Sequence, residues 1–204
     1  MSPFELARDD GPLARVLAPL GAAVRLPAAA LLLLGAIPLF AVMAIGGGGA
    51  SDVLVGAVLA WLVVAGAMSR GRPYDDPLRW AVPPTLRLVE YASIVWLGAL
   101  AGGSGPAAAF ALLAAVGFRH YDLFYRPRFL GSSPPPWVGD VAGGWDGRLV
   151  GAYVLLLAGA LPAGLFAAAG LLGALFAAES LRAWWRAQDT GFVPGYVDDG
   201  GGEE

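Results

Sequence analysis

Long hydrophobic segments without charge alternate with short polar connections along this chain. A bilayer core about 30 Å thick requires roughly 20 residues of helix at 1.5 Å per residue, and a range of about 17 to 25 is usable. Six segments meet or approach that length, at about 27–45, 52–69, 86–102, 106–125, 146–161 and 163–184. The pattern predicts an all-α fold, an integral membrane bundle of six transmembrane helices.

Two parts of this pattern depend on local sequence. In the third segment the apolar run 91–101 is too short to span, so the helix must include residues 86–90 and with them Arg87. The fifth and sixth segments are separated only by a break at Pro162. Because that connection is so short, they are predicted to form an antiparallel hairpin.

Arginine placement predicts the orientation of the bundle. All 13 basic residues are arginine, and they lie before the first segment, between the second and third, between the fourth and fifth, and after the sixth. The other connections, 46–51, 101–105 and 160–164, contain none. Basic residues in short loops stay cytoplasmic, so both termini are predicted to be cytoplasmic. Arginine without lysine is typical of a GC-rich bacterial genome, and the predicted location is therefore the inner (plasma) membrane of a bacterium.

The two ends of the chain differ from the transmembrane domain, which covers residues 27–186. Residues 1–26 carry leucine and valine at helical spacing beside arginine and aspartate, which predicts a cytoplasmic amphipathic segment in the membrane interface. A cleaved signal peptide is the alternative, but the apolar run 27–45 exceeds the usual length of about 7–15 residues. Residues 187–204 are rich in glycine and acid and are predicted to form a disordered tail.

Composition narrows the classes of function. The chain is 57% hydrophobic and 14% charged, whereas soluble domains are roughly one quarter charged. A net charge of −3 argues against a nucleic-acid partner, because a duplex binder needs a basic face. The absence of cysteine excludes disulfides and thiol nucleophiles, and a single histidine argues against a histidine-rich zinc site.

Ionisable residues gather at the predicted cytoplasmic ends of four segments. Charge inside or just under a membrane is costly, so each such residue needs a partner. In the fourth segment Arg119, Asp122 and Arg126 follow one another at helical spacing and share a face. The candidate anion ligands in the four segments are Arg87, Arg119, His120, Arg126 and Arg148. Their candidate acidic partners are Glu90, Asp122, Asp146 and Glu179.

Two interpretations of this polar cluster stay open. In one, the arginines form a cationic pocket for a phosphate headgroup, and the carboxylates pair with them or hold a divalent cation such as Mg²⁺ as a cofactor. In the other, the same residues form salt bridges and snorkelling side chains that fasten helix ends. His120 could accept a proton or make a structural hydrogen bond. Asp75 and Asp76 could bind metal or cap a turn, and no metal site is assigned.

Three stretches carry a resemblance to a known family. They are PLRW at 77–80 with residues 83–91, FRHYD at 118–122 continuing to Arg128, and GGWDGRL at 143–149. They resemble an actinobacterial multi-pass membrane domain of unknown function, sometimes fused to CDP-alcohol phosphatidyltransferase and nucleotidyltransferase domains. The resemblance covers about residues 73–186. It implies a role in phospholipid metabolism and a phospholipid-synthesis enzyme as a candidate partner, and it supplies no catalytic residues.

The chain lacks the metal-binding motif of the CDP-alcohol phosphotransferases themselves. That motif runs Asp-x-x-Asp-Gly-x-x-Ala-Arg and continues with two further aspartates, whereas Asp146-Gly147-Arg148 reproduces only a fragment and no aspartate follows until Asp189. The leading hypothesis is an accessory membrane protein that binds a phosphate-bearing lipid or headgroup at the cytoplasmic face. A structural or assembly subunit without catalysis is the alternative. A small-solute transporter is a third, but the sequence places no charge near the membrane midplane.

Overall fold

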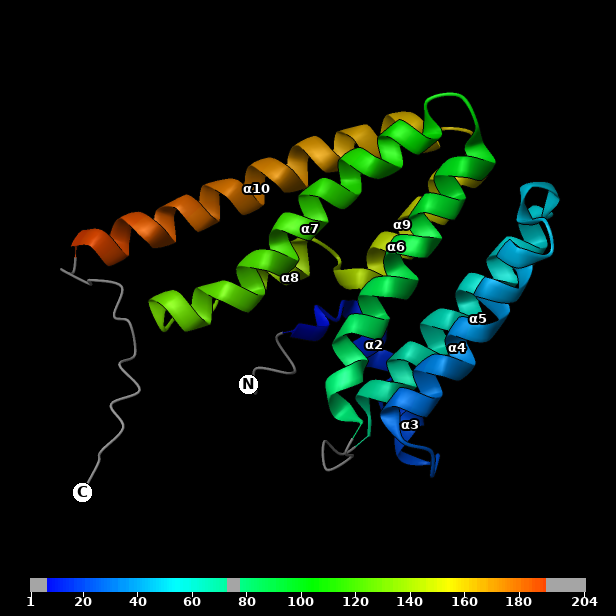
Figure 1. The fold of residues 1–204 in the computed structure, drawn as a ribbon, viewed down its shortest axis with the longest axis horizontal. Helices are drawn as coiled ribbons and strands as arrows, with labels where there is room; N and C mark the ends of the chain where they lie inside the picture. Colours follow the sequence, from blue (N-terminus) through cyan, green and yellow to red (C-terminus); the bar gives the residue numbers. More distant parts are fainter. Residues whose placement is uncertain (1–6, 73–77, 190–204) are drawn as a thin grey trace, which may run out of the picture.

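All regular secondary structure is helical in the computed structural model, which describes residues 7–72 and 78–189 (Figure 1). The predicted all-α class is therefore confirmed. The helices are α2 (Pro12–Leu17), α3 (Pro19–Ala22), α4 (Ala28–Ala44), α5 (Asp52–Arg70), α6 (Val82–Ala101), α7 (Gly105–Leu130), α8 (Pro136–Val141), α9 (Gly144–Leu157) and α10 (Leu161–Asp189), with 3-10 turns at Gly47–Gly49 and Arg79–Ala81.

Local sequence explains where the long helices begin and end. Helix α5 follows Ser51, whose hydroxyl oxygen accepts a hydrogen bond from the Leu54 amide at 3.3 Å. Helix α6 begins at Val82, earlier than predicted, because the prolines that follow suit a first helical turn. Helix α7 continues past the predicted residue 125 and stops at Gly131, which adopts a φ of +61°. Helix α9 ends at residue 157, short of the predicted 161.

Several helices have the length and composition of membrane spans. Among the described residues, α5, α7 and α10 are long and apolar enough to cross a bilayer. Helix α4 is apolar but has 17 residues, and α9 has 14, which corresponds to about 21 Å of helix. Arg87 and Glu90 lower the mean hydropathy of α6. These features are those of a membrane protein.

The helices run back and forth between two ends of the molecule. In Figure 1 the α4–α5, α6–α7 and α9–α10 connections lie toward the upper right, and α2 and α3 lie at the opposite end. Helices α7 and α10 pack along each other and extend away from the rest. The main core contains Leu32, Leu62, Leu97 and Leu149, one from each of α4, α5, α6 and α9.

The N-terminal segment, residues 7–23, packs closely against the bundle. It forms two short helices, α2 and α3, in place of the single amphipathic helix that the sequence suggests. A Cβ atom on Gly21 would overlap the Met68 carbonyl at the end of α5, so only glycine permits this approach. Val16 and Leu20 stay exposed, whereas Arg8 is buried. The place of this segment at a membrane surface remains a prediction, but its attachment to α5 is part of the fold.

Candidate functional site

The first of three buried ionic clusters joins the N-terminal segment to α5 and α9. Arg8 Nε donates to Asp10 Oδ2 at 2.7 Å, and Arg70 Nη1 donates to the same oxygen at 2.6 Å. The indole Nε1 of Trp145 donates to Asp10 Oδ1 at 2.8 Å. Burial raises the pKa of the Asp10 carboxyl, but Arg8, Trp145 and Arg70 outweigh it and hold that pKa below its usual value. Asp10 is therefore ionised, and its contacts hold the N-terminal segment to α5 and α9.

The second cluster centres on Arg148 of α9. Arg148 Nη2 donates to Asp9 Oδ2 at 2.9 Å, and its Nε donates to Glu90 Oε1 at 2.6 Å. His120 completes the cluster, with Nε2 at 3.7 Å from Asp9 Oδ2 and Nδ1 at 2.8 Å from the Tyr91 hydroxyl. Burial raises the pKa of Asp9, yet Arg148, His120 and Arg119 together bring it well below its usual range.

The third cluster connects α7 to α10. Arg126 Nη1 and Nη2 donate to the two carboxylate oxygens of Glu179 at 2.8 and 2.6 Å, a bidentate arrangement. The Arg126 Nη2 atom also lies 2.7 Å from Asp122 Oδ2, and the Ser180 hydroxyl donates to Asp122 Oδ1 at 3.0 Å. Arg126, Asp122 and Glu179 thus contact one another as the sequence predicts. Their hydrogen bonds are made within the cluster and not to an added ligand.

Asp146 binds backbone groups and contacts no arginine within 4 Å among the side chains that the structure describes. Its carboxylate accepts hydrogen bonds from the backbone amides of Gly11, Leu13 and Ala14, at 2.6, 2.9 and 3.1 Å. These are the unpaired donors at the start of α2, and an anion at a helix N-terminus stabilises it. Asp146 therefore holds the N-terminal segment to α9, which differs from its predicted role as an arginine partner.

Arg119 has a different environment from the other buried arginines. Its residue is 4% exposed, its Nε has no hydrogen-bond partner, and within residues 7–72 and 78–189 no carboxylate lies within 4 Å of its guanidinium. Its Cζ lies 5.5 Å from the centroid of the Phe176 ring. A buried cation without an ionic partner carries a large desolvation penalty. Among the buried arginines of the predicted set, Arg119 is thus the one with capacity for an added anion.

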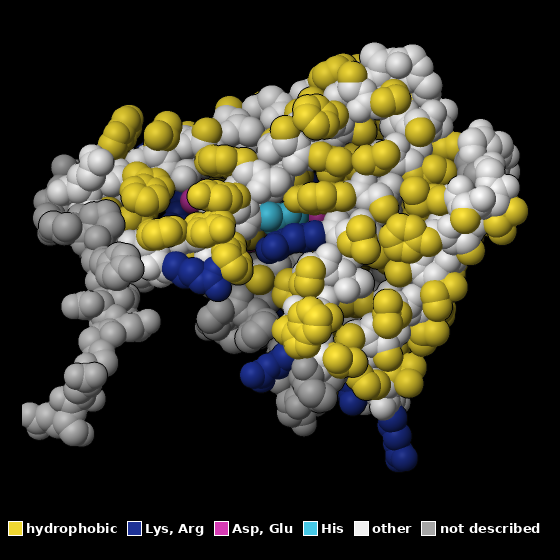
Figure 2. All heavy atoms as spheres, in the orientation of Figure 1, with side chains coloured by type: hydrophobic (Ala, Val, Ile, Leu, Met, Phe, Trp, Pro, Cys, Tyr) yellow, Lys and Arg dark blue, Asp and Glu magenta, His cyan; other side chains and the backbone are white. Residues whose placement is uncertain are grey.

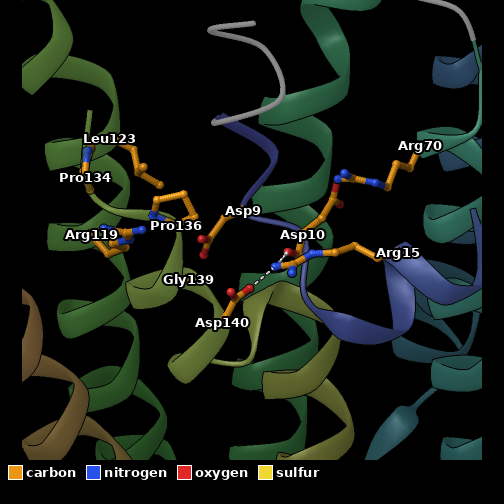
Figure 3. Close-up of a pocket in the computed structure, with 10 residues that line it drawn as sticks. All are labelled: Asp9, Asp10, Arg15, Arg70, Arg119, Leu123, Pro134, Pro136, Gly139 and Asp140. Atoms are coloured by element: carbon orange, nitrogen blue, oxygen red, sulfur yellow. Dashed lines mark hydrogen bonds and ion pairs between the residues drawn. The ribbon is translucent and has the colours of Figure 1, made fainter. Parts of the chain in front are cut away.

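Arg119 lines a cavity of about 240 Å³ between the N-terminal segment, α7 and α8 (Figure 3). In Figure 3, Arg119 reaches in from one side and Arg70 from the other, with Asp9 and Asp10 between them. Arg15 and Asp140 form an exposed ion pair at this cavity. A Cβ on Gly139 would lie 3.8 Å from Arg119 Nη2, so the glycine leaves that side of the cavity free.

The surface view shows a small polar region among apolar side chains. Figure 2 shows hydrophobic side chains spread across the visible surface, with arginine and histidine side chains between α6 and α7. Arg87, also predicted as an anion ligand, is half-buried and donates from Nη2 to the Ala7 carbonyl at 3.2 Å. It fastens the N-terminal segment and has no ion pair with Glu90 among those the structure describes.

The described carboxylates do not form a metal site. Within the part of the chain that the structure describes, no three His, Asp or Glu side chains converge as metal ligands. Most of the buried carboxylates bind arginine, and Asp146 binds backbone amides. Asp75 and Asp76 lie outside the described residues.

Sequence reasoning missed the residues that complete the clusters from the N-terminal side. Arg8, Asp9 and Asp10 are all buried, and Asp9 adopts a φ of +50°, a conformation that few residues other than glycine tolerate. One feature of the sequence could have indicated these residues. Asp9 and Asp10 directly precede Gly11, where a helix is interrupted, and Pro12, which favours the first turn of a helix. Buried arginines just under a membrane also require acidic partners close by, and Asp9 and Asp10 were available for that role.

Comparison with known proteins assigns the chain to a family whose function is unknown. Neither a curated protein nor a solved structure is similar enough to match it. The profile of a family described as "Family of unknown function (DUF5941)" matches residues 4–203, a wider range than the resemblance seen in residues 73–186. The match therefore includes the N-terminal segment and all three ionic clusters, and the chain belongs to the DUF5941 family.

Proposed function

We propose that this protein crosses a bacterial plasma membrane six times and binds a phosphate-bearing headgroup at the cytoplasmic face. The observation that carries the binding proposal is Arg119, a buried guanidinium that lines a cavity and has no carboxylate within 4 Å among the described residues. The proposed role is accessory to phospholipid headgroup chemistry. A phospholipid-synthesis enzyme as partner remains a prediction from the resemblance alone.

The arrangement of the helices supports the six-span proposal. The three connections without arginine lie toward the same end of the molecule, and the ionic clusters draw the arginine-bearing segments together away from it (Figure 1). Basic residues stay cytoplasmic, so the clustered end is the proposed inner face. Helix α9 is short for a full span, which a local thinning of the bilayer would accommodate.

Single cysteines test this topology, because the natural chain contains none. We expect cysteines at Gly47 and Ser104 to react in intact cells with a reagent that cannot cross the membrane. A cysteine at Ser133 should react only after the cells are opened. Labelling of Ser133 from outside would contradict the orientation, and protection of Gly47 and Ser104 in intact cells would contradict the positions of the turns.

The chemistry of the cavity favours a phosphate group. Guanidinium groups bind phosphate oxygens through paired hydrogen bonds, and Arg119 is aimed at the cavity from α7. Arg15 and Arg70 line the same cavity, although each already contacts an aspartate. A phosphate near Arg119 would therefore meet one guanidinium with no described carboxylate within 4 Å, and two further arginines line the same cavity beside Asp9, Asp10 and Asp140.

Replacement of Arg119 by glutamine is the direct test of the binding proposal. We expect Arg119→Gln to weaken binding of short-chain phosphatidic acid by about 10- to 100-fold, since a hydrogen bond to a charged group contributes roughly 1.5–3 kcal/mol. Titration calorimetry of the full chain in a neutral detergent measures this. Inorganic phosphate, titrated in parallel, distinguishes a free anion from a lipid headgroup.

Arg128→Gln is the matched control, because Arg128 is on the same helix but is exposed and stacks on Phe124 at 3.5 Å. It should leave binding unchanged. Thermal stability separates a ligand role from a structural one. Removing an unpaired buried charge should leave the melting temperature of Arg119→Gln unchanged or higher. Unchanged affinity in Arg119→Gln would contradict the proposal.

A further inference from the structure

A second cavity, of about 250 Å³, lies between α7 and α10 on a different side of α7. Its lining includes Tyr121, Tyr125 and Phe129 of α7, Trp184 of α10, and the charged residues Asp122 and Arg126. None of the residues that line the first cavity appears in this set. The two cavities therefore present different chemistry, and the anion proposed for the first does not explain the second.

Aromatic rings form most of the wall of this second cavity. The Tyr121 and Tyr125 ring centroids are 4.3 Å apart, and the Tyr125 and Phe129 rings stack at 5.9 Å. Trp184 contributes from α10 and is 38% exposed. The faces of aromatic rings carry partial negative charge and attract cations, Trp most strongly. Several rings around one space are therefore the usual surroundings of a bound ammonium group.

An ionic cluster adjoins the cavity: Asp122 and Arg126 line it, and Glu179 binds Arg126 from beside it. Arg126 binds both Asp122 and Glu179, so the three side chains together carry one net negative charge when both carboxyls are ionised. The side chain of Glu179 is 14% exposed and that of Asp122 is 9% exposed. Within the described part of the chain, no second arginine lies within 4 Å of either carboxylate. A cation in the cavity would therefore lie beside a cluster with one more carboxylate than arginine.

The aromatic surface next to this cavity already holds a cation of the protein itself. The guanidinium carbon of Arg128 lies 3.5 Å from the centroid of Phe124, and the Phe124 ring meets Tyr125 edge to face at 5.0 Å. This contact shows that the ring of Phe124, next to the cavity, accepts a cation over its face. Aromatic residues at a membrane boundary also serve as anchors, but anchoring requires neither a cavity nor a negative charge at its wall.

We propose that the aromatic cavity between α7 and α10 binds an organic ammonium group, such as the trimethylammonium group of choline. The rings of Tyr121, Tyr125 and Trp184 surround the methyl groups, and the excess charge of the Asp122–Arg126–Glu179 cluster balances the cation. The ammonium group belongs either to a lipid headgroup or to a free amine of the cytoplasm.

The test compares choline with its uncharged isostere. The full-length protein in a neutral detergent is titrated with choline and with 3,3-dimethyl-1-butanol, which has the same shape without the charge. We expect choline to bind saturably and at least about tenfold more tightly than the alcohol. Equal binding of the two compounds would show a merely apolar groove and overturn the proposal, as would the absence of saturable choline binding.

Two neighbouring tryptophans supply a matched pair of variants. Trp184 lines the cavity, whereas Trp185 is 62% exposed and does not. Trp184→Leu should weaken choline binding by about 3- to 30-fold, the range expected for loss of a cation–π contact, and Trp185→Leu should not change it. Equal affinity in the two variants would overturn the assignment to this cavity.

Competition identifies the source of the ammonium group. Displacement of choline by phosphatidylcholine in nanodiscs, but not by phosphatidylglycerol, would support the proposal with a lipid headgroup as the ligand. Choline binding that neither lipid displaces would support it with a free amine. Displacement by phosphatidylglycerol alone, which lacks an ammonium group, would overturn it.

Discussion

Replacing Gly144 by alanine is expected to release the N-terminal segment and destabilise the protein by several kcal/mol. Gly144 has a φ of +62°, and an added Cβ would overlap the Gly11 amide and lie 2.7 Å from the carbonyl carbon of Asp10. To relieve the overlap, the segment must move away from α9 and lose its hydrogen bonds to Asp146. Backbone strain of about 1–3 kcal/mol adds to that loss. The melting temperature and the fraction of monodisperse protein in detergent measure the effect.

Gly147→Ala is the control for this prediction. Gly147 lies three residues further along α9, and a Cβ there would meet nothing within 4 Å. Alanine favours a helix over glycine by about 1 kcal/mol, so this variant should be as stable as the natural protein or slightly more so. If both alanine variants melted at the same temperature, the close contact between Gly11 and Gly144 would not be holding the N-terminal segment.

The sequence predicted those features that depend on local pattern. Apolar length located the long helices α4, α5, α6, α7, α9 and α10, and proline and glycine placed most of their ends to within a few residues. The helical spacing of Arg119, Asp122 and Arg126 put them on one face, and the structure buries all three. Arginine placement indicated which segment ends lie together, and the Arg126–Glu179 contact between α7 and α10 agrees with that grouping.

The remaining features depend on contacts between residues far apart in the chain. Asp9 reaches Arg148 across 139 positions, and no periodicity in the sequence relates the two. Residues 8–10 carry one positive and two negative charges beside an apolar helix pattern, which is also typical of a solvated end. Asp146 looked like an arginine partner because a carboxylate in such a segment usually is one. Its actual partners are backbone amides. Every residue except proline carries one, so the sequence does not indicate which amides a carboxylate will bind.

The sequence also did not indicate which arginine could bind an added anion. Arg119, Arg126 and Arg148 are all buried arginines on long helices, and the sequence assigns them one common role. The structure distinguishes them by their partners, since Arg126 and Arg148 each contact two carboxylates and Arg119 contacts none of those described. Pairing, more than burial, separates a structural arginine from a candidate ligand.

Arg148→Gln is expected to destabilise the protein by about 3–5 kcal/mol, the usual effect of breaking a buried ion pair from one side. The change leaves Asp9 and Glu90 buried, and both then lack their strongest partner. Thermal unfolding in detergent measures the loss. Arg182→Gln, an exposed position on α10, removes the same charge and should change stability by less than about 0.5 kcal/mol.

A double variant tests whether this loss comes from the stranded carboxylates. Glu90→Gln alone should also destabilise the protein, because it leaves Arg148 with one carboxylate in place of two. In the Glu90→Gln and Arg148→Gln double variant, one of the two stranded charges has been removed, so its loss of stability should be smaller than the sum of the two single losses by about 1–3 kcal/mol. Strict additivity would mean that the two side chains act independently. In that case the 2.6 Å contact between them would contribute nothing, and Asp9 would be the effective partner of Arg148.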